Sequence, residues 1–167
     1  MKTHTGCSCY LSDICSVNTQ QAQLTRILVI DEIPLISVGL QEIFRLTQPD
    51  IQLGYTDNIF RALSSREYGD RSFDLIILGS DREHPSDSLL THAASLKQRF
   101  SGSRVMIFTD QYDPEIIAQT TGHTVDACVH KHESPEEIRK AYATLSAGKS
   151  YVSPIFETLY YSYRLDR

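Results

Sequence analysis

Short apolar runs alternate with longer amphipathic stretches through most of the chain. Five of the runs predict β-strands, which lie at 27–30, 51–55, 75–78, 105–108 and 125–129. The first, third and fourth runs are continuously apolar, as in central parallel strands that helices cover on both faces. Strand and helix patterns that alternate over 167 residues predict one doubly wound α/β domain with a parallel sheet.

The intervals between the runs carry helical periodicity and capping residues. Leu40 and Phe44 fall on one face of a helix that begins near Pro34. The segment SPEE at 134–137 predicts an N-cap, a proline in the first turn and a capping box, and Gly148 ends the same helix. The pattern therefore predicts five helices that connect the five strands.

The first 24 residues are rich in Ser, Thr, Gln and Cys and have no sustained periodicity, which predicts a flexible leader. Cys7, Cys9 and Cys15 cluster there, with His4 nearby. A zinc site is one interpretation, and reduced thiols on a mobile leader are the other, because C-x-C-x5-C lacks a second paired half. Cys128 lies in an apolar run and is predicted to be a small core residue.

Composition narrows the classes of partner. The net charge is −5 and the isoelectric point is about 5.6, so the chain has no overall basic field that would attract nucleic acid. No run approaches the roughly 20 apolar residues that cross a bilayer, and the N-terminus lacks the apolar stretch of a secretory signal. We expect a cytoplasmic protein with no membrane association.

Polar residues follow the predicted strands at the points where they end. Asp31 and Glu32 follow the first strand, Gly79 follows the third, Thr109 the fourth and Lys131 comes after the fifth. The carboxyl ends of parallel strands meet at one edge of the sheet, where open α/β sheets bind ligands. We therefore expect these positions to converge on one rim.

Four segments match the sequence pattern of a known family; they are RILVIDEIPLISVGLQEIF, DLIIL, VMIFTD and ACVHKHESPEEIRKAYATLSAGKSYVSP. Over residues 26–154 the chain resembles the receiver domain of bacterial response regulators, and the NarL/FixJ type most of all. The resemblance implies a flavodoxin-like sheet of five parallel strands in the order 2-1-3-4-5. It divides the chain into a leader at 1–24, a receiver-like domain at 25–152 and a tail or linker at 153–167.

In that family an acidic pair holds Mg²⁺, an Asp at the end of the third strand accepts phosphate, and a hydroxyl residue and a Lys contact the phosphoryl group. The resemblance places the acidic pair at Asp31 and Glu32, the hydroxyl at Thr109 and the ammonium at Lys131. The acceptor position holds Gly79, which has no side chain to phosphorylate. The resemblance therefore implies a degenerate phosphorylation pocket.

Two further departures accompany the glycine. Cys128 stands where the family usually has an aromatic switch residue, and the loop at 80–85 delays the usual proline. Asp81 in that loop is the candidate for a displaced acceptor and for a third metal ligand beside Asp31 and Glu32. The cofactor expectation is none, or a weak Mg²⁺ site at these three acids.

The surviving rim residues have a structural interpretation as well. Without an acceptor carboxylate, Lys131 finds its countercharge in Asp31, and the two form an ion pair at a helix–strand junction. The alternative is a retained ligand or ion pocket. His130 and His132 flank Lys131, and they are either pH-sensing groups or solvated loop residues.

Three function classes follow. The leading one is a pseudo-receiver, not an enzyme, that acts in signal transduction or transcription regulation through a protein partner or a homo- or heterodimer. The alternative is a phosphorylatable two-component receiver that uses Asp81. The third, a flavodoxin-like enzyme or nucleotide binder, is disfavoured because neither a G-x-G-x-x-G sequence nor a nucleophile elbow occurs.

The composition of the tail at 153–167 is relevant to how the chain would bind a protein partner. Its apolar and aromatic residues predict either an interface or a short helix packed on its own domain; they are Phe156, Leu159, Tyr160, Tyr161 and Tyr163. NarL/FixJ-type proteins usually continue into a helix-turn-helix domain, for which this tail is too short. We expect no specific DNA binding by this chain alone, whether it is a stand-alone partner or a truncated regulator.

Overall fold

A parallel sheet of six strands, in the order β2-β1-β3-β4-β5-β6, forms the centre of the molecule. The computed structural model describes residues 25–68, 72–79, 86–120 and 124–165. The strands are β1 (Arg26–Ile30), β2 (Gln52–Thr56), β3 (Leu75–Gly79), β4 (Arg104–Thr109), β5 (Ala127–His130) and β6 (Tyr151–Val152). The predicted doubly wound parallel sheet is confirmed.

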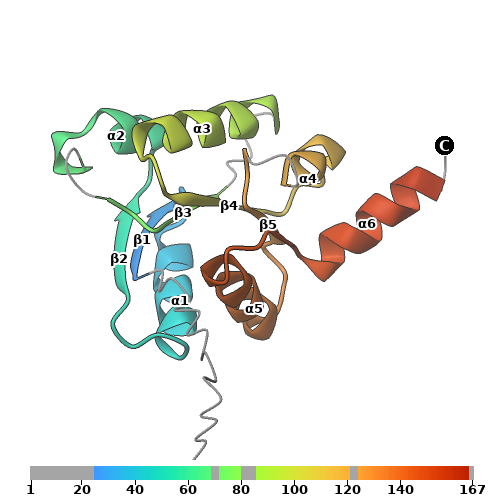
Figure 1. Cartoon of the computed structure of the whole chain (residues 1–167), viewed down its shortest axis with the longest axis horizontal. Coiled ribbons are helices and arrows are strands. Elements are labelled where there is room, and N and C mark those ends of the chain that lie inside the picture. Colours follow the sequence, from blue (N-terminus) through green and yellow to red (C-terminus); the bar gives the residue numbers. More distant parts are fainter. Residues whose placement is uncertain (1–24, 69–71, 80–85, 121–123, 166–167) are drawn as a thin grey trace, which may run out of the picture.

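Helices cover both faces of this sheet. They are α1 (Pro34–Arg45), α2 (Ile59–Ser64), α3 (Ser86–Arg99), α4 (Pro114–Thr120), α5 (Pro135–Ser146) and α6 (Pro154–Leu165), with a 3-10 turn at Arg66–Tyr68. Figure 1 shows α2, α3 and α4 on one face and α1 and α5 on the other, and each layer encloses its own apolar cluster. The continuously apolar strands in the middle of the sheet contribute to both clusters, as expected of parallel strands.

The expectation of five strands is wrong by one. β6 adds two residues beside β5, where the Tyr151 N–H donates to the Asp126 carbonyl at 3.1 Å and the Ser153 N–H donates to the Cys128 carbonyl at 3.0 Å. A two-residue strand has no hydrophobic periodicity to reveal it. Its backbone hydrogen bonds to β5, which the sequence does not encode locally, define it.

Local capping explains where several helices begin and end. The Ser134 hydroxyl accepts a hydrogen bond from the Glu137 N–H at 3.3 Å, so the predicted N-cap of α5 is present. The Asp113 carboxylate accepts from the Glu115 N–H at 2.7 Å before α4. Gly148 follows α5 with a φ of 79°, a left-handed conformation that favours glycine.

The segment predicted as a tail or linker forms helix α6, which is anchored in the core. Phe156 is fully buried and belongs to the same apolar cluster as Cys128 and Ile116. Farther along, the Tyr163 ring lies 6.2 Å from the Tyr112 ring of the β4–α4 loop. Of the two readings of this segment, the structure has the helix packed on its own domain, and the end of α6 extends away from the body (Figure 1).

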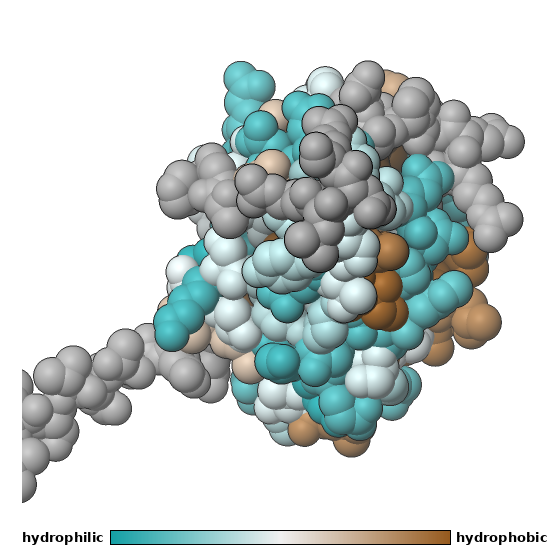
Figure 2. Space-filling view, turned by 90° about the vertical axis from the view of Figure 1, so that its right-hand side faces the viewer, coloured by the Kyte–Doolittle hydropathy of each residue, from teal (hydrophilic) through white to brown (hydrophobic). Residues whose placement is uncertain are grey.

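The surface on the α6 side is mostly hydrophilic or neutral. Figure 2 shows hydrophobic residues there in separate groups, right of the centre, at the right edge and at the bottom of the view. Within the described residues no helix combines the length and the apolar character that a bilayer crossing needs. The cysteine cluster of the leader, with His4, and the loop that contains Asp81 lie outside the residues that the structure describes.

Candidate functional site

The carboxyl ends of four strands bring the sequence-predicted rim together. Gly79 is the last residue of β3 and pairs with Phe108, while Thr109, the last residue of β4, pairs with His130. Asp31 directly follows β1. The doubly wound topology thus converts positions far apart in the sequence into neighbours at one edge of the sheet.

Asp31 and Lys131 form a buried ion pair across this rim. The Lys131 Nζ donates to Asp31 Oδ2 at 2.9 Å, and the two side chains are 13% and 1% exposed, respectively. Asp31 Oδ1 accepts a second hydrogen bond from the Ile33 N–H at 2.9 Å. Both carboxylate oxygens therefore have a donor, the arrangement that a charge so far from solvent requires.

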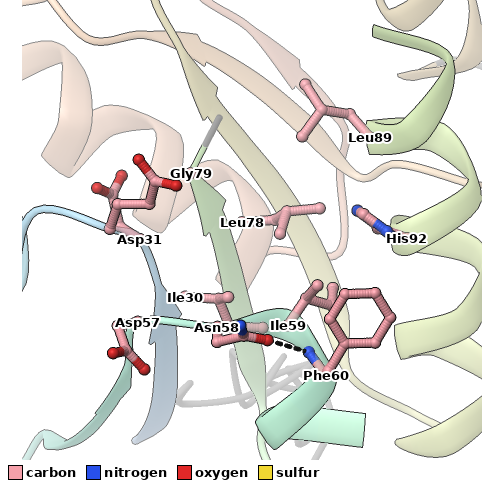
Figure 3. A pocket seen from close by; sticks show the side chains of 11 residues that line it. Ile30, Asp31, Asp57, Asn58, Ile59, Phe60, Leu78, Gly79, Leu89 and His92 are labelled. Atoms are coloured by element: carbon pink, nitrogen blue, oxygen red, sulfur yellow. Dashed lines mark hydrogen bonds between the residues drawn. The ribbon is translucent and has the colours of Figure 1, made fainter. Parts of the chain in front are cut away.

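The Asp31 carboxylate fills the space directly above Gly79. A Cβ placed on Gly79 would lie 1.9 Å from Asp31 Oδ2 and 2.6 Å from Asp31 Cγ. Figure 3 shows the two residues side by side at the ends of their strands. Any side chain at position 79 must therefore displace Asp31, and glycine at that position is tied to the ion pair.

Two other rim residues, Thr109 and Glu32, differ in burial. Thr109 is fully buried, its hydroxyl accepts from the Gln111 N–H at 3.0 Å, and its carbonyl accepts from the Lys131 N–H at 2.9 Å. It thereby shapes the β4–α4 loop and holds the backbone of Lys131. Glu32, by contrast, has an exposed side chain.

Cys128, which the resemblance places at the family's switch position, lies inside the core. Its side chain is 1% exposed, and burial raises the pKa of the thiol to about 12. A thiol with such a pKa stays protonated and is a poor nucleophile. In this fold the position contributes packing, and Phe156 of α6 belongs to the same apolar cluster.

His130 is a packed residue at the end of β5. Its ring lies 5.1 Å from the His132 ring and 5.0 Å from the Phe156 ring, and its Nδ1 accepts from the His132 N–H at 3.1 Å. Burial, and secondarily the neighbouring His132, lower the pKa of His130 below its ordinary value. This histidine therefore favours the neutral form in the folded protein.

The described rim does not fit the Mg²⁺ that the resemblance implies. Both oxygens of Asp31 are occupied, by Lys131 and by a backbone N–H, and position 79 supplies no carboxylate. No group of three or more metal-ligating side chains occurs among the described residues. A hard dication needs several free oxygens, so Mg²⁺ at Asp31 would first have to displace the ammonium of Lys131.

A pocket of about 110 Å³ lies beside the rim (Figure 3). Its lining comes from the ends of β1 and β3, from the start of α2 and from α3; it comprises Ile30, Asp31, Glu32, Asp57, Asn58, Ile59, Phe60, Leu78, Gly79, Leu89 and His92. Sequence reasoning missed the group at 57–60. The signal was present, because Asp57 and Asn58 follow β2 just as Asp31 follows β1.

Tyr55 holds the backbone of the rim at Asp31. The Tyr55 hydroxyl, on β2, donates to the Asp31 carbonyl at 2.9 Å, and the Tyr68 hydroxyl donates to the Tyr55 carbonyl at 3.2 Å. These contacts fix the backbone at which β1 passes into the loop. They had no sequence signature, because Tyr55 belongs to an ordinary strand pattern.

Solved structures similar to this one include receiver domains. The isolated REC domain of RcsB from Salmonella enterica serovar Typhimurium, in the presence of phosphomimetic BeF3-, has a TM-score of 0.65 at 16% identity, covering 82% of this chain and 99% of that one. The fold is that of a response-regulator receiver domain.

Two other structures extend the comparison. A two-component response regulator of the LuxR family from Aurantimonas sp. SI85-9A1 has a TM-score of 0.66 at 18% identity, covering 86% of this chain and 99% of that chain. An RcsB–DNA complex has a TM-score of 0.66 at 17% identity, covering 83% of this chain but 68% of that chain. No protein-family model and no curated protein matches the sequence.

Proposed function

We propose that this chain is a pseudo-receiver of the NarL/FixJ type, which acts in signal transduction or transcription regulation by binding another protein. The observation that carries the proposal is the position of Asp31. Its carboxylate occupies the space above Gly79 and pairs with Lys131 at 2.9 Å. The place that the side chain of an acceptor would take at position 79 is therefore filled by the Asp31 carboxylate.

The chemistry of the rim supports binding over phosphorylation at this place. Gly79 supplies no oxygen nucleophile, and positioning cannot replace an absent attacking atom. The ammonium of Lys131 already has a buried counterion, so an incoming phosphoryl group would have to compete with Asp31. On this proposal the described rim keeps the scaffold of the switch without phosphorylation at position 79.

Exposed apolar side chains supply candidate contact surfaces. Leu35 and Val38 of α1 are 74% and 54% exposed, and Tyr161 of α6 is 66% exposed. Aromatic and aliphatic residues of this kind anchor protein interfaces. A protein partner or a second copy of the chain is the expected ligand, and with a net charge of −5 the chain by itself is not expected to bind DNA specifically.

The test is the intact mass of the chain after incubation with acetyl phosphate and Mg²⁺. An ordinary receiver that carries an acceptor Asp serves as the positive control in the same tube. The proposal predicts no phosphate adduct on this chain while the control is modified.

A phosphate adduct that disappears in Asp81→Asn would overturn the proposal in favour of the displaced acceptor. An adduct that survives this substitution would also overturn it, and peptide mapping would then locate the modified residue.

A further inference from the structure

The start of helix α6 is held by residues at the end of β5 and in the β5–α5 loop. The Ile155 N–H, in the first turn of α6, donates to the Glu133 carboxylate at 2.9 Å. Just before the helix, the buried Ser153 hydroxyl accepts from the His130 N–H at 3.1 Å. A carboxylate on the free N–H groups of a first turn stabilises a helix. A movement of Glu133 would therefore weaken the attachment of α6.

The His130 ring lies at the centre of this attachment. It meets the Phe156 ring of α6 at 5.0 Å, and its Nδ1 accepts from the His132 N–H at 3.1 Å. The His130 carbonyl accepts from the Glu133 N–H at 3.0 Å. The ring thus packs against the helix and also closes the turn that carries Glu133.

The hydrogen bond to His130 Nδ1 requires a neutral ring. A histidine that gains a proton has an N–H at both ring nitrogens and can no longer accept. Protonation would therefore set two N–H donors against each other, one on the ring and one on the His132 backbone. It would also place a positive charge beside the fully buried Phe156. The turn at 130–133 would have to rearrange.

The charged groups around His130 show where a protonated ring would turn. Two acids face it, Glu133 on its own loop and Asp110 on the β4–α4 loop, and both favour the charged form. Burial, and secondarily His132, lower the pKa of His130 and favour the neutral form. From α6 the ring meets the uncharged Phe156. A positive ring is thus attracted to Glu133, the carboxylate that also holds α6.

The far half of α6 is less firmly attached than its start. Leu159, Tyr161 and Tyr163 are exposed there, and the helix extends away from the body (Figure 1). Tyr163 meets the ring of Tyr112 at 6.2 Å, and the buried Tyr112 hydroxyl has no hydrogen-bond partner among the described residues. A buried donor without a partner costs free energy, and water would satisfy it once α6 left. The position of α6 therefore depends mainly on its start.

We propose that α6 is a helix released by a proton: protonation of His130 draws Glu133 away from the Ile155 N–H, and α6 leaves α4 and β5 while the sheet stays folded. Release would uncover the apolar cluster that Phe156 shares with Ile116 of α4. The inference rests on the proposed function in one respect, because a receiver that works without phosphate needs a different input.

The test is native-state hydrogen exchange of the ¹⁵N-labelled full chain from pH 7.5 to 5.0, expressed as protection factors relative to the intrinsic rate at each pH. The α6 amides at 157–163 should exchange faster than those of β1 and β3, because the sheet stays folded when α6 opens. Released His130 has a pKa near 6.5, and the attached ring has a lower one. The α6 protection factors should therefore fall below about pH 6.5, by up to about tenfold per pH unit for one proton.

Variants separate the proton from the packing. His130→Gln cannot titrate and should abolish most of this fall. His132→Gln keeps the backbone N–H but removes a charge that lowers the pKa of His130, so the fall should be smaller. Glu133→Ala removes the carboxylate that holds Ile155 and should lower the α6 protection factors already at pH 7.5. His92→Gln, on α3 and outside this attachment, is the matched control and should leave the pH dependence unchanged.

Three results overturn the inference: α6 amides that exchange only together with the sheet, α6 protection factors that stay constant with pH, or a fall that His130→Gln leaves intact. The β1 and β3 amides show whether each variant folds. If His130→Gln does not fold, an unchanged fall in His132→Gln overturns the inference instead.

This experiment and the mass experiment fail separately. If α6 is not released, the pseudo-receiver proposal still stands as long as no phosphate adduct forms. A phosphate adduct overturns the pseudo-receiver proposal whatever hydrogen exchange gives.

Discussion

Two aspartates, one at each end of the parallel sheet, perform the same task in different surroundings. At the carboxyl end Asp31 binds Lys131 at 2.9 Å and the Ile33 N–H at 2.9 Å. At the amino end Asp126 binds Lys97 at 2.8 Å and the Val105 N–H at 2.7 Å. Each carboxylate therefore joins a distant basic side chain to a backbone donor.

The two aspartates differ in solvent exposure and in the number of cations that they contact. The Asp126 side chain is 14% exposed and contacts a second cation, Arg104, at 3.3 Å. The Asp31 side chain is 1% exposed, and within the described residues Lys131 is the cation paired with it. A buried single pair tolerates the loss of one member far less than a partly solvated cluster does, so we expect the carboxyl end of the sheet to be the more sensitive one.

Removing the buried acid should give the largest effect. Asp31→Ala leaves the ammonium of Lys131 buried without its partner, which should lower the free energy of unfolding by about 3–5 kcal/mol. Chemical denaturation with the two-state slope checked for each variant measures this loss. The double variant Asp31→Leu/Lys131→Met should recover most of it, because it removes both charges. A cost no greater than that of Asp126→Ala would contradict the comparison.

The corresponding change at the amino end should cost less. Asp126→Ala removes hydrogen bonds to charged groups, with an expected loss of about 1.5–3 kcal/mol. Lys97 and Arg104 are 26% and 30% exposed and can hydrate once the carboxylate has gone. The same denaturation experiment measures the loss, and equal costs at the two ends would show that burial does not distinguish them.

Gly79→Ala tests whether the ion pair and the glycine are coupled. The added methyl would lie 1.9 Å from Asp31 Oδ2, and relieving such overpacking should cost about 1–3 kcal/mol. Gly54→Ala is the matched control, because there an added Cβ meets Leu28 at an ordinary 3.6 Å.

The coupling itself is measured by a double-mutant cycle. Once Asp31→Ala has removed the obstructing carboxylate, Gly79→Ala should have little further cost. Strict additivity of the two substitutions would mean that the clash is relieved elsewhere, and the tie between glycine and ion pair would be wrong.

The comparison also marks what the sequence could reveal. Continuous apolar runs predicted the strands, and the strand-end rule brought Asp31, Gly79 and Lys131 to one rim, including the ion pair as one of two interpretations. Periodicity could not reveal β6, which is two residues long. Nor could it place Phe156 in the core, since burial of α6 depends on α4 and β5, elements distant in the chain.

The sequence could not predict, for a different reason, that the Asp31 carboxylate fills the space above Gly79. A missing side chain shows that a nucleophile is absent, but it does not show which neighbour moves into its place. That depends on the side-chain torsions of Asp31 and on the reach of Lys131, both set by tertiary packing. Asp57 and Asn58 were accessible to the strand-end rule, because they follow β2, but the resemblance assigns no role to these positions.

The smallest predicted effect is a pH dependence confined to the carboxyl end. The pKa of His130 is lowered by burial and by His132, while Glu133 and Asp110 act in the opposite direction. The unfolded chain therefore takes up this proton near pH 6.5, and the folded chain does so at lower pH. The contribution of His130 to the free energy of unfolding is fully present above about pH 6.5. It is lost as the pH falls toward the pKa of the folded state.

Urea unfolding of the wild type and of His130→Gln between pH 7.5 and 5.5 measures this contribution as a difference between two slopes. His130→Gln should flatten the decline, because glutamine does not titrate and the His130 ring otherwise gains its proton beside Phe156, 5.0 Å away. Asp126→Ala, at the opposite end of the sheet, should lower the stability at every pH and leave the slope unchanged. A slope that His130→Gln leaves intact would assign the titration to another group, and the two ends would then differ in burial alone.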